Sequence, residues 1–578
     1  MMPNYDREPI QTVPGFGDQA FAKARILPAL RAKLCLQKNV LVVDCYPGVD
    51  YEELKALLQP LGFAAQYCSD DCALAPAALD AAFAPNLTKD RVFGMMTQGQ
   101  LAQYFCPEKL AAMRDAIASA PAGNILLYGV GAGLVCDGTL RVFAELTRWE
   151  IQLRWRAGQD NWHTAQTGLP ILSKYKRGFF IEWRLADRYK KQRYETYDFY
   201  LDMTRANRPA MISAAAFWAA MRQTARQPFR LVPYFDPGVW GGHWMKDTFA
   251  LPENGSNYAW SFDGVPEENS LKYDFDGVRW ETPAQNLVLT QPRALLGERV
   301  HARFGAEFPI RFDYLDTMGG QNLSLQVHPL TEYIQENFGM HYTQDESYYM
   351  MQAGEDACVY LGTKTGVDRQ AMLENLREAE QGKRPFDAEK YINRFPVKKH
   401  DHVLIPAGTV HCSGKNAVVL EISATPYIFT FKLWDWDRLG LDGLPRPVHL
   451  KHGAANIQWD RDTRWVKQEL LHRETTVHSA DGVLVERTGL QEREFIDTFR
   501  FTLTGPAPVS VRRNGSVHML NLIEGEEIAI QSPTAAWPDF TVHYGETFLL
   551  PEAAGAYRLA PAPGNTGDTM VILACVRG

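Results

Sequence analysis

Two polar side chains alternate along a short apolar segment, residues 323–329. Gln326 and His328 are two positions apart, and the apolar Leu325 and Val327 alternate with them. Successive side chains of a β-strand point to opposite faces, so a strand here would place the amide and the imidazole on one face. The segment is therefore a candidate for presenting two ligand side chains in the same direction.

Two further candidate ligands lie downstream. Glu346 begins an aromatic and apolar run, and His411 follows a Pro–Gly corner. With Gln326 and His328, they would supply one amide oxygen, two imidazole nitrogens and one carboxylate oxygen. This mixed set suits Zn²⁺ with a position left for water or substrate, at bond lengths of roughly 2.0–2.2 Å. Spacing alone also leaves a structural role open, because a single histidine near a strand is more commonly a structural residue than a ligand.

The first part of the chain alternates strand-like and helix-like segments. Residues 39–44 form an apolar run, a Pro–Gly turn follows, and residues 51–61 have a helical pattern. A second buried-strand pattern, residues 124–129, runs into a series of glycines. Strands that alternate with helices favour a parallel sheet. We therefore predict an α/β domain with a largely parallel sheet over residues 1–228.

The glycine series at residues 129–133 is a candidate phosphate-binding loop. It lacks the Lys-Ser/Thr pair of a P-loop and has the wrong glycine spacing for a dinucleotide fingerprint. Residues 180–191 are faintly similar to the strand and basic lid region of uridine-kinase-type P-loop proteins. Without the lysine, the sequence does not support kinase activity and favours a strand-to-helix turn. It leaves open whether this domain binds a nucleotide.

The rest of the chain has the pattern of two β-rich domains. The Pro- and Gly-containing residues 233–238 indicate a boundary near residue 229. A short polar helical pattern then interrupts the strand-like segments, and later short strands are separated by Gly, Pro and Asn turns, as in a sandwich or jelly roll. We predict a domain at 229–470 with a helical insertion at about 366–395, and a final β domain at 471–578.

Four parts of this region resemble, in order, the type I mannose-6-phosphate isomerases, which are zinc enzymes of the cupin fold. They are residues 323–329, residues 360–362, residues 405–411 with 420–422, and residues 434–438. The resemblance extends over roughly residues 229–578. It implies a zinc-binding cupin (jelly roll) catalytic domain, followed by a second cupin-like domain without metal.

The resemblance also implies roles for individual residues. It implies that the Zn²⁺ ligands are Gln326, His328, Glu346 and His411. It makes Glu421 the first candidate for the base that transfers a proton, with a structural carboxylate paired to a Lys or Arg as the alternative. It places Ser324 near the substrate phosphate.

The chain departs from the family at two positions. The family has a catalytic arginine where this chain has Lys432, and a lysine where this chain has Gln344. Lysine keeps the positive charge but loses the forked donor geometry of arginine, so we expect Lys432 to bind substrate and act in catalysis in a modified way. At Gln344, a cation near the substrate has been lost.

The implied reaction interconverts mannose 6-phosphate and fructose 6-phosphate. This aldose–ketose isomerisation moves a proton between C1 and C2 through an enediolate, which Zn²⁺ stabilises as a Lewis acid. The two departures leave alternatives open. One is a zinc isomerase of another sugar or sugar phosphate, and the other is a non-catalytic protein that senses or binds a sugar.

Composition excludes several classes of partner. A formal charge of −8 without a Lys/Arg-rich run argues against a nucleic-acid surface, and no apolar run approaches the length of a membrane span. Nine cysteines scattered over 578 residues favour reduced thiols over a disulfide framework. We therefore expect a cytoplasmic protein. The resemblance implies that its partner is a small-molecule sugar phosphate.

Overall fold

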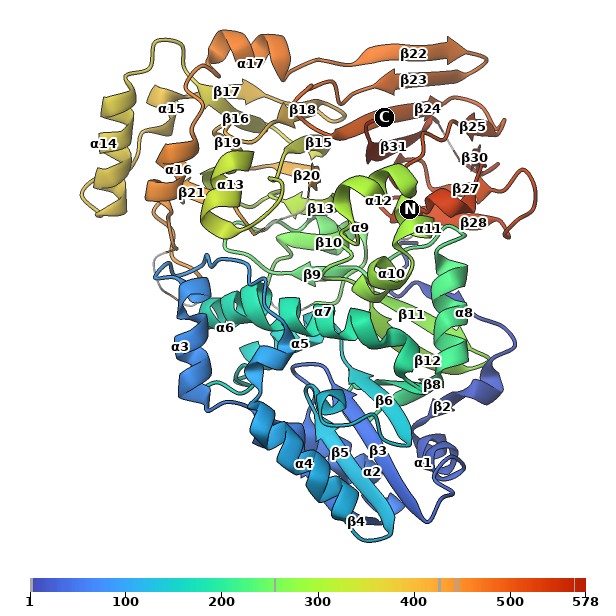
Figure 1. The fold of residues 1–578 in the computed structure, drawn as a ribbon. Coiled ribbons are helices and arrows are strands. Elements are labelled where there is room, and N and C mark those ends of the chain that lie inside the picture. Colours follow the sequence, from blue (N-terminus) through green and yellow to red (C-terminus); the bar gives the residue numbers. More distant parts are fainter. Residues whose placement is uncertain (1–3, 254–255, 425–427, 442, 444–445, 566) are drawn as a thin grey trace. The chain divides into compact units, whose positions relative to one another are not determined.

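The computed structural model describes residues 4–253, 256–424, 428–441, 443, 446–565 and 567–578 (Figure 1). The chain forms two compact units, and each is discontinuous in sequence. The β unit comprises Met1–Glu8, Ala225–Pro266 and Pro292–Gly578, and the α/β unit comprises Pro9–Thr224 and Glu267–Gln291. The segment Glu267–Gln291 lies beyond the boundary expected near residue 229. It belongs to the α/β unit because its strand β11 (Ser270–Phe275) pairs with both β1 (Ile10–Thr12) and β12 (Val278–Pro283).

A seven-stranded sheet with the order β2-β8-β7-β6-β3-β5-β4 forms the α/β unit. Five of its strands are parallel, and their order becomes 2-3-1-4-5 when they are numbered along the chain. They are β3 (Lys38–Cys45), β4 (Phe63–Cys68), β5 (Gly123–Gly129), β6 (Leu140–Glu145) and β7 (Phe199–Asp202). The antiparallel strands β8 (Ala210–Ser213) and β2 (Ala20–Ala22) complete the sheet. The predicted largely parallel sheet is confirmed.

Helices connect these strands, as the alternation of apolar runs and helical patterns predicts. They are α1 (Lys23–Arg31), α2 (Tyr51–Leu58), α3 (Pro76–Leu87), α4 (Pro107–Ser119), α5 (Arg148–Arg156), α6 (Ile171–Arg177), α7 (Trp183–Arg193), α8 (Ala214–Thr224) and α10 (Gln285–Thr290). Among the helices of the described residues, none combines the length and the apolar character needed to cross a bilayer.

The carboxyl ends of the parallel strands, where open α/β sheets bind ligands, hold side chains of the unit itself. Asp44 at the end of β3 accepts hydrogen bonds from the Tyr189 hydroxyl at 2.8 Å and from the Gly133 backbone N–H at 3.1 Å. Lys190 Nζ lies 3.7 Å from Glu145 Oε2 at the end of β6. The predicted strand-to-helix glycine turn therefore donates to a protein carboxylate, and α7 supplies the side chains that cover this edge.

Two antiparallel sheets form the first part of the β unit. The six-stranded sheet contains, in spatial order, β18 (His402–Ile405), β15 (Glu346–Ala353), β20 (Ala417–Ala424), β13 (Ile310–Asp316), β10 (Trp260–Gly264) and β9 (Tyr234–Asp236). The five-stranded sheet contains β17 (Ile392–Pro396), β16 (Cys358–Thr363), β19 (His411–Ser413), β14 (Leu325–Val327) and β21 (Phe431–Trp434). Almost every residue of β13, β15 and β20 is buried, so both faces of the six-stranded sheet are covered.

Short helices join these strands. They are α9 (Trp244–Thr248), α11 (Pro292–Leu296), α12 (Glu298–Phe304), α13 (Thr331–Phe338), α14 (Arg369–Glu380), α15 (Ala388–Tyr391), α16 (Leu450–Asn456) and α17 (Thr463–Glu469). The pair α14 and α15 lies between β16 and β17, in the region where we expect a helical insertion. The Asp368 side chain caps α14 by accepting a hydrogen bond from the Ala371 N–H at 3.0 Å.

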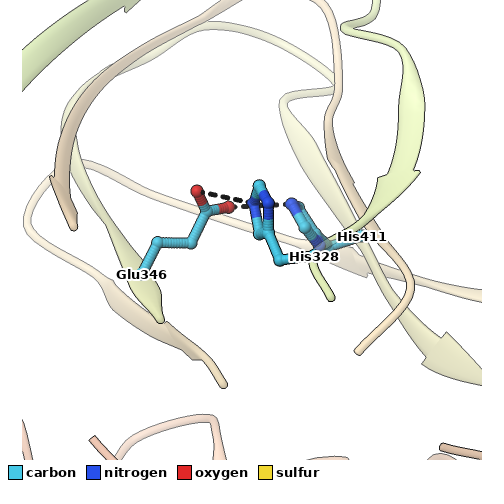
Figure 2. A group of neighbouring side chains, drawn as sticks. All are labelled: His328, Glu346 and His411. Carbon is cyan, nitrogen blue, oxygen red and sulfur yellow. Dashed lines mark ion pairs between the residues drawn. The ribbon is translucent and has the colours of Figure 1, made fainter. Parts of the chain in front are cut away.

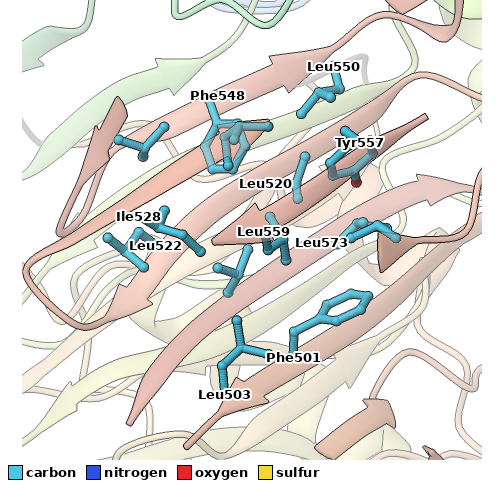
Figure 3. Packing of buried hydrophobic residues seen from close by; sticks show 14 of the residues in the cluster. Phe501, Leu503, Leu520, Leu522, Ile528, Phe548, Leu550, Tyr557, Leu559 and Leu573 are labelled. Carbon is cyan, nitrogen blue, oxygen red and sulfur yellow. The ribbon is translucent and has the colours of Figure 1, made fainter. Parts of the chain in front are cut away.

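A second pair of antiparallel sheets forms the end of the β unit. One contains β22 (Thr475–Ala480), β23 (Val483–Arg487), β24 (Ile496–Leu503), β31 (Thr569–Val576), β26 (His518–Glu524) and β29 (Thr547–Leu550). The other contains β25 (Val509–Val511), β30 (Tyr557–Pro561), β27 (Glu527–Gln531) and β28 (Phe540–His543). Alternate residues, such as Leu520 and Leu522 of β26, build one buried apolar core from strands of both sheets (Figure 3). This agrees with the all-β pattern in the sequence.

A buried pair of acidic residues makes the stability of the α/β unit depend on pH. Burial, together with the charge of Glu281, raises the pKa of Asp202 to about 7. An unfolded aspartate releases its proton near pH 4, so between about pH 4 and 7 the folded state holds a proton that the unfolded state lacks. The free energy of unfolding should therefore fall as pH rises through this window, by at most about 1.4 kcal/mol per pH unit.

We expect Glu281→Gln to lower the pKa of Asp202 and so to flatten this decline. The substituted amide keeps an oxygen that can accept from Ser270 Oγ, which lies 2.6 Å from Glu281 Oε1. Urea unfolding, followed by tryptophan fluorescence between pH 4 and 8, measures the slope. The exposed Glu195→Gln is the matched control. An unchanged slope in the Glu281 variant would contradict the assignment.

Candidate metal centre

Three side chains that could ligate a metal ion converge inside the β unit. His328 Nε2 lies 3.0 Å from Glu346 Oε2, and His411 Nε2 lies 2.8 Å from Glu346 Oε1 (Figure 2). One potential ligand atom from each residue lies within 4.8 Å of the others. All three residues are at most 1% exposed. The carboxylate therefore lies between two imidazoles in a site shielded from solvent.

The six-stranded and five-stranded sheets of the β unit, which together form its first sandwich, both supply these residues. His328 directly follows β14 and His411 begins β19, and both of these strands belong to the five-stranded sheet. Glu346 begins β15 of the six-stranded sheet, where it pairs with Ser423 of β20. The ligands thus sit at strand ends on two sheets that face one another across the site.

Backbone carbonyls determine which imidazole nitrogen faces the carboxylate. The Nδ1–H groups of His328 and His411 donate to the carbonyls of Phe429 at 3.2 Å and Thr409 at 2.8 Å. The Nε2 atom of each imidazole is therefore the one that points at an oxygen of Glu346. His328 Nε2 and Glu346 Oε1 are buried and have no hydrogen-bond partner. A metal cation satisfies such an arrangement, and second-shell carbonyls of this kind orient metal-ligating histidines.

The electrostatics of Glu346 favour its ionised form. Burial alone would raise the pKa of this carboxyl, but the neighbouring His328 and His411 outweigh burial and hold the pKa well below its usual range. A carboxylate that stays ionised at neutral pH is the form that binds a metal ion.

The fourth predicted ligand, Gln326, lies beside this group. It is directly opposite His411 in the pairing of β14 with β19, and its Nε2 is 3.2 Å from His411 Nε2. A 180° rotation of the amide exchanges its nitrogen and oxygen and turns the oxygen toward the centre. The structure thus brings together all four residues that the sequence analysis selected as ligands.

Two predicted substrate-binding residues lie beside β14, the strand that carries Gln326. Ser324 is buried and directly precedes β14. Lys432 is half-buried on β21, opposite Gln326 in the pairing of β14 with β21. Direct pairing puts Lys432 and Gln326 on the same face of the sheet.

Glu421, the candidate base, lies on the same face of the six-stranded sheet as Glu346. Its strand β20 places it two residues before Ser423, the partner of Glu346. Glu421 Oε1 accepts hydrogen bonds from Arg311 Nη2, from Ser423 Oγ at 2.9 Å and from Gln344 Nε2 at 3.2 Å. Burial and the charge of Glu346 raise the pKa of Glu421 more than Arg311 lowers it. Glu421 is thus near the centre and is also paired with a buried arginine.

Residues that the sequence patterns did not single out also support the face of the six-stranded sheet that carries Glu346 and Glu421. Arg311 and Asp313 are buried on β13, with Arg311 Nε 2.9 Å from Asp313 Oδ2. Charged residues at alternating positions in an otherwise apolar strand were the available signal. Arg461 is also buried, and its Nη1 donates to the carbonyls of Pro406 and Ala407 at 2.7 and 2.6 Å. It holds the turn that precedes His411, and no local sequence pattern reveals this contact.

The segment between β23 and β24 also places an acidic group near the centre. Glu494 is buried, and its Oε1 has no hydrogen-bond partner. Burial, followed by the charge of Asp345, raises the pKa of Glu494 well above its ordinary value. The segment between β23 and β24, which carries Glu494, therefore contributes to the electrostatics around Asp345, the residue that precedes Glu346.

Removing a ligand should reduce metal binding. Loss of an outer-sphere partner typically weakens metal binding roughly 10–100-fold, so His411→Ala and Glu346→Gln should each cost at least that much. The metal content of dialysed protein, measured by inductively coupled plasma mass spectrometry, provides the test. The exposed His243→Ala is the matched control. Full metal occupancy in either ligand variant would refute the assignment.

A family model and several curated relatives each match part of the chain. A family model described as a domain of unknown function (DUF8485) matches residues 24–226. Mannose-6-phosphate isomerase ManA of Bacillus subtilis (strain 168) is 24% identical over 334 residues, covering 58% of this chain and 96% of the relative. The mannose-6-phosphate isomerase of Streptococcus mutans serotype c is 26% identical over 334 residues, covering 57% of this chain and 95% of the relative.

Solved structures give matches of similar extent. The crystal structure of the mannose 6-phosphate isomerase from Bacillus subtilis has a TM-score of 0.47 and 19% identity, covering 60% of this chain and 99% of that one. A zinc-bound mannose 6-phosphate isomerase has a TM-score of 0.46 and 14% identity, covering 61% and 100%. Over more than half of its length, this chain is therefore similar in sequence to proteins named mannose-6-phosphate isomerase.

Proposed function

We propose that this protein is a zinc-dependent aldose–ketose isomerase that interconverts mannose 6-phosphate and fructose 6-phosphate. The observation that carries the proposal is the buried His328–Glu346–His411 group, in which the Nε2 atoms of two imidazoles face one carboxylate. The sequence relatives that bear the name mannose-6-phosphate isomerase support it. In this proposal, the β unit holds a cupin catalytic domain up to about residue 470 and a second cupin-like domain without metal at residues 471–578. The α/β unit, which includes Glu267–Gln291, is a separate domain.

The residues of the centre fit a zinc site with mixed nitrogen and oxygen ligands. Gln326, His328, Glu346 and His411 would hold the ion. When bound, zinc would act as a Lewis acid on the C1 and C2 oxygens of the sugar and stabilise the negative charge of the enediolate.

Glu421 would transfer the proton between C1 and C2. Its position on the face that carries Glu346 brings a carboxylate near the centre, and its raised pKa moves its basicity toward neutrality, where a general base works best. Arg311, Ser423 and Gln344 hold one carboxylate oxygen in place. A base fixed in this way keeps its direction while the substrate binds.

Lys432 and Ser324 would bind the substrate phosphate. The half-buried lysine offers a point charge opposite Gln326, and the buried hydroxyl of Ser324 lies at the start of the same strand. Gln344 and Lys432 also support a second candidate, an isomerase of another sugar phosphate. Gln344 is neutral, and Lys432 lacks the forked donor geometry of arginine. These two side chains would therefore recognise the charge and shape of a substrate differently.

The reaction can be observed directly. We expect the zinc-loaded protein to exchange the C2 proton of mannose 6-phosphate with solvent deuterium and to form fructose 6-phosphate, both followed by NMR. Glu421→Gln should keep its zinc and lose roughly 10²–10⁴-fold in turnover, the usual contribution of a positioned acid or base. The exposed Glu355→Gln serves as the control.

Two results would count against this assignment. Near-normal turnover by the Glu421 variant would remove Glu421 from the mechanism. Absence of exchange with mannose 6-phosphate and with other sugar phosphates, despite bound zinc, would exclude the isomerase and favour a protein that only binds sugars.

Lys432 provides a test of substrate choice. Restoring the forked donor by Lys432→Arg should increase kcat/KM for mannose 6-phosphate if this compound is the substrate, because arginine binds phosphate in a bidentate way. The exposed Lys451→Arg is the matched control. A decrease for mannose 6-phosphate with an increase for another sugar phosphate would support the second candidate.

A further inference from the structure

Gln344 links the two carboxylates of the candidate site. It is 2% exposed, and its Nε2 lies 3.2 Å from Glu346 Oε2 and 3.2 Å from Glu421 Oε1. The NH₂ group has two hydrogens, one for each carboxylate oxygen. The reverse orientation would place the amide oxygen against two negatively charged groups. Chemistry therefore fixes the amide with its nitrogen toward the carboxylates and its oxygen away from them.

The oxygen of this amide has no donor. Gln344 Oε1 is buried and has no hydrogen-bond partner, and the same is true of the Tyr348 hydroxyl, two residues after Glu346 on β15. Buried acceptors without partners are rare in folded proteins, and each calls for an explanation such as a bound molecule. The acceptor of Gln344 therefore has the properties expected of a group that meets a donor on a ligand.

We propose that Gln344 Oε1 accepts a hydrogen bond from a hydroxyl group of the bound sugar and so determines substrate specificity. This inference rests on the proposed sugar phosphate site and identifies a contact within it. A lysine at this position would offer three donors and no acceptor. The amide thus recognises a hydroxyl group where a cation would add charge.

The contact should make binding depend strongly on one hydroxyl of the sugar. A site built to bond a hydroxyl rejects analogues that lack it, because its own polar group is then left buried without a partner. The dependence should disappear when the acceptor is removed from the protein, since neither partner of the bond is then present.

Calorimetric titration of the zinc-loaded protein can test this with binding, and not turnover, as the readout. The ligands are mannose 6-phosphate and its 2-deoxy, 3-deoxy and 4-deoxy analogues. Gln344→Met removes both donor and acceptor. Gln344→Lys keeps donors for Glu346 and Glu421, removes the acceptor and adds a positive charge, so comparison with the neutral Met variant separates the effect of the acceptor from the effect of charge. The exposed Gln335→Met is the control, and metal content and thermal melting verify every variant.

We expect the loss of one hydroxyl to weaken binding to the native protein by about 10- to 100-fold, as for a buried polar group left without its partner. The Met and Lys variants should bind mannose 6-phosphate and that analogue with nearly equal Kd. Equal dependence on every hydroxyl in native and variant proteins would overturn the inference.

The proton-exchange assay separates this inference from the proposed function. Turnover combined with a Kd pattern unaffected by Gln344 would refute the hydroxyl contact and leave the isomerase standing. Binding that depends on Gln344 without turnover would retain the contact and exclude the isomerase. A native protein that binds none of the four compounds would refute both.

Discussion

The interior of the first sandwich depends on the carboxylate of Glu346, which lies between two imidazole nitrogens. Burying an ionised group is costly unless charges or hydrogen bonds compensate it. Here the compensation comes from His328 and His411 on the opposite sheet, and each of these is held by a backbone carbonyl. The register of both sheets must therefore be correct for the site to exist, because a shift of one residue would turn these side chains away.

The six-stranded sheet has a polar inner face built by cross-strand pairing. Three neighbouring strands contribute to it, with Arg311 opposite Ser423, Glu421 opposite Tyr348, and Glu346 again opposite Ser423. Arg311 neutralises part of the negative charge, and Gln344 connects the two acids. The same residues therefore stabilise the sheet and form the candidate site. A change at either Glu346 or Glu421 also affects the other, because the Gln344 amide donates to both.

Local patterns in the sequence predicted the types of element and selected four candidate ligands that the structure places close together. Alternation placed Gln326 and His328 on one face, and the apolar runs indicated a parallel sheet followed by β domains. The contacts of Arg311 with Glu421 and of Arg461 with Pro406 could not be predicted, because they depend on pairing between residues far apart in the chain. The same holds for Glu267–Gln291, which joins the α/β unit through pairing of β11 with β1, near the start of the chain.

The discontinuity of both units constrains how such a gene can change. The chain passes from one unit to the other after Glu8, Thr224, Pro266 and Gln291, so no single break separates them. Cutting after Thr224 would leave β11 and β12 on the C-terminal fragment and β1 without a partner. Recombination that shuffles modules as contiguous blocks would therefore disrupt both units, which favours their inheritance as one indivisible piece.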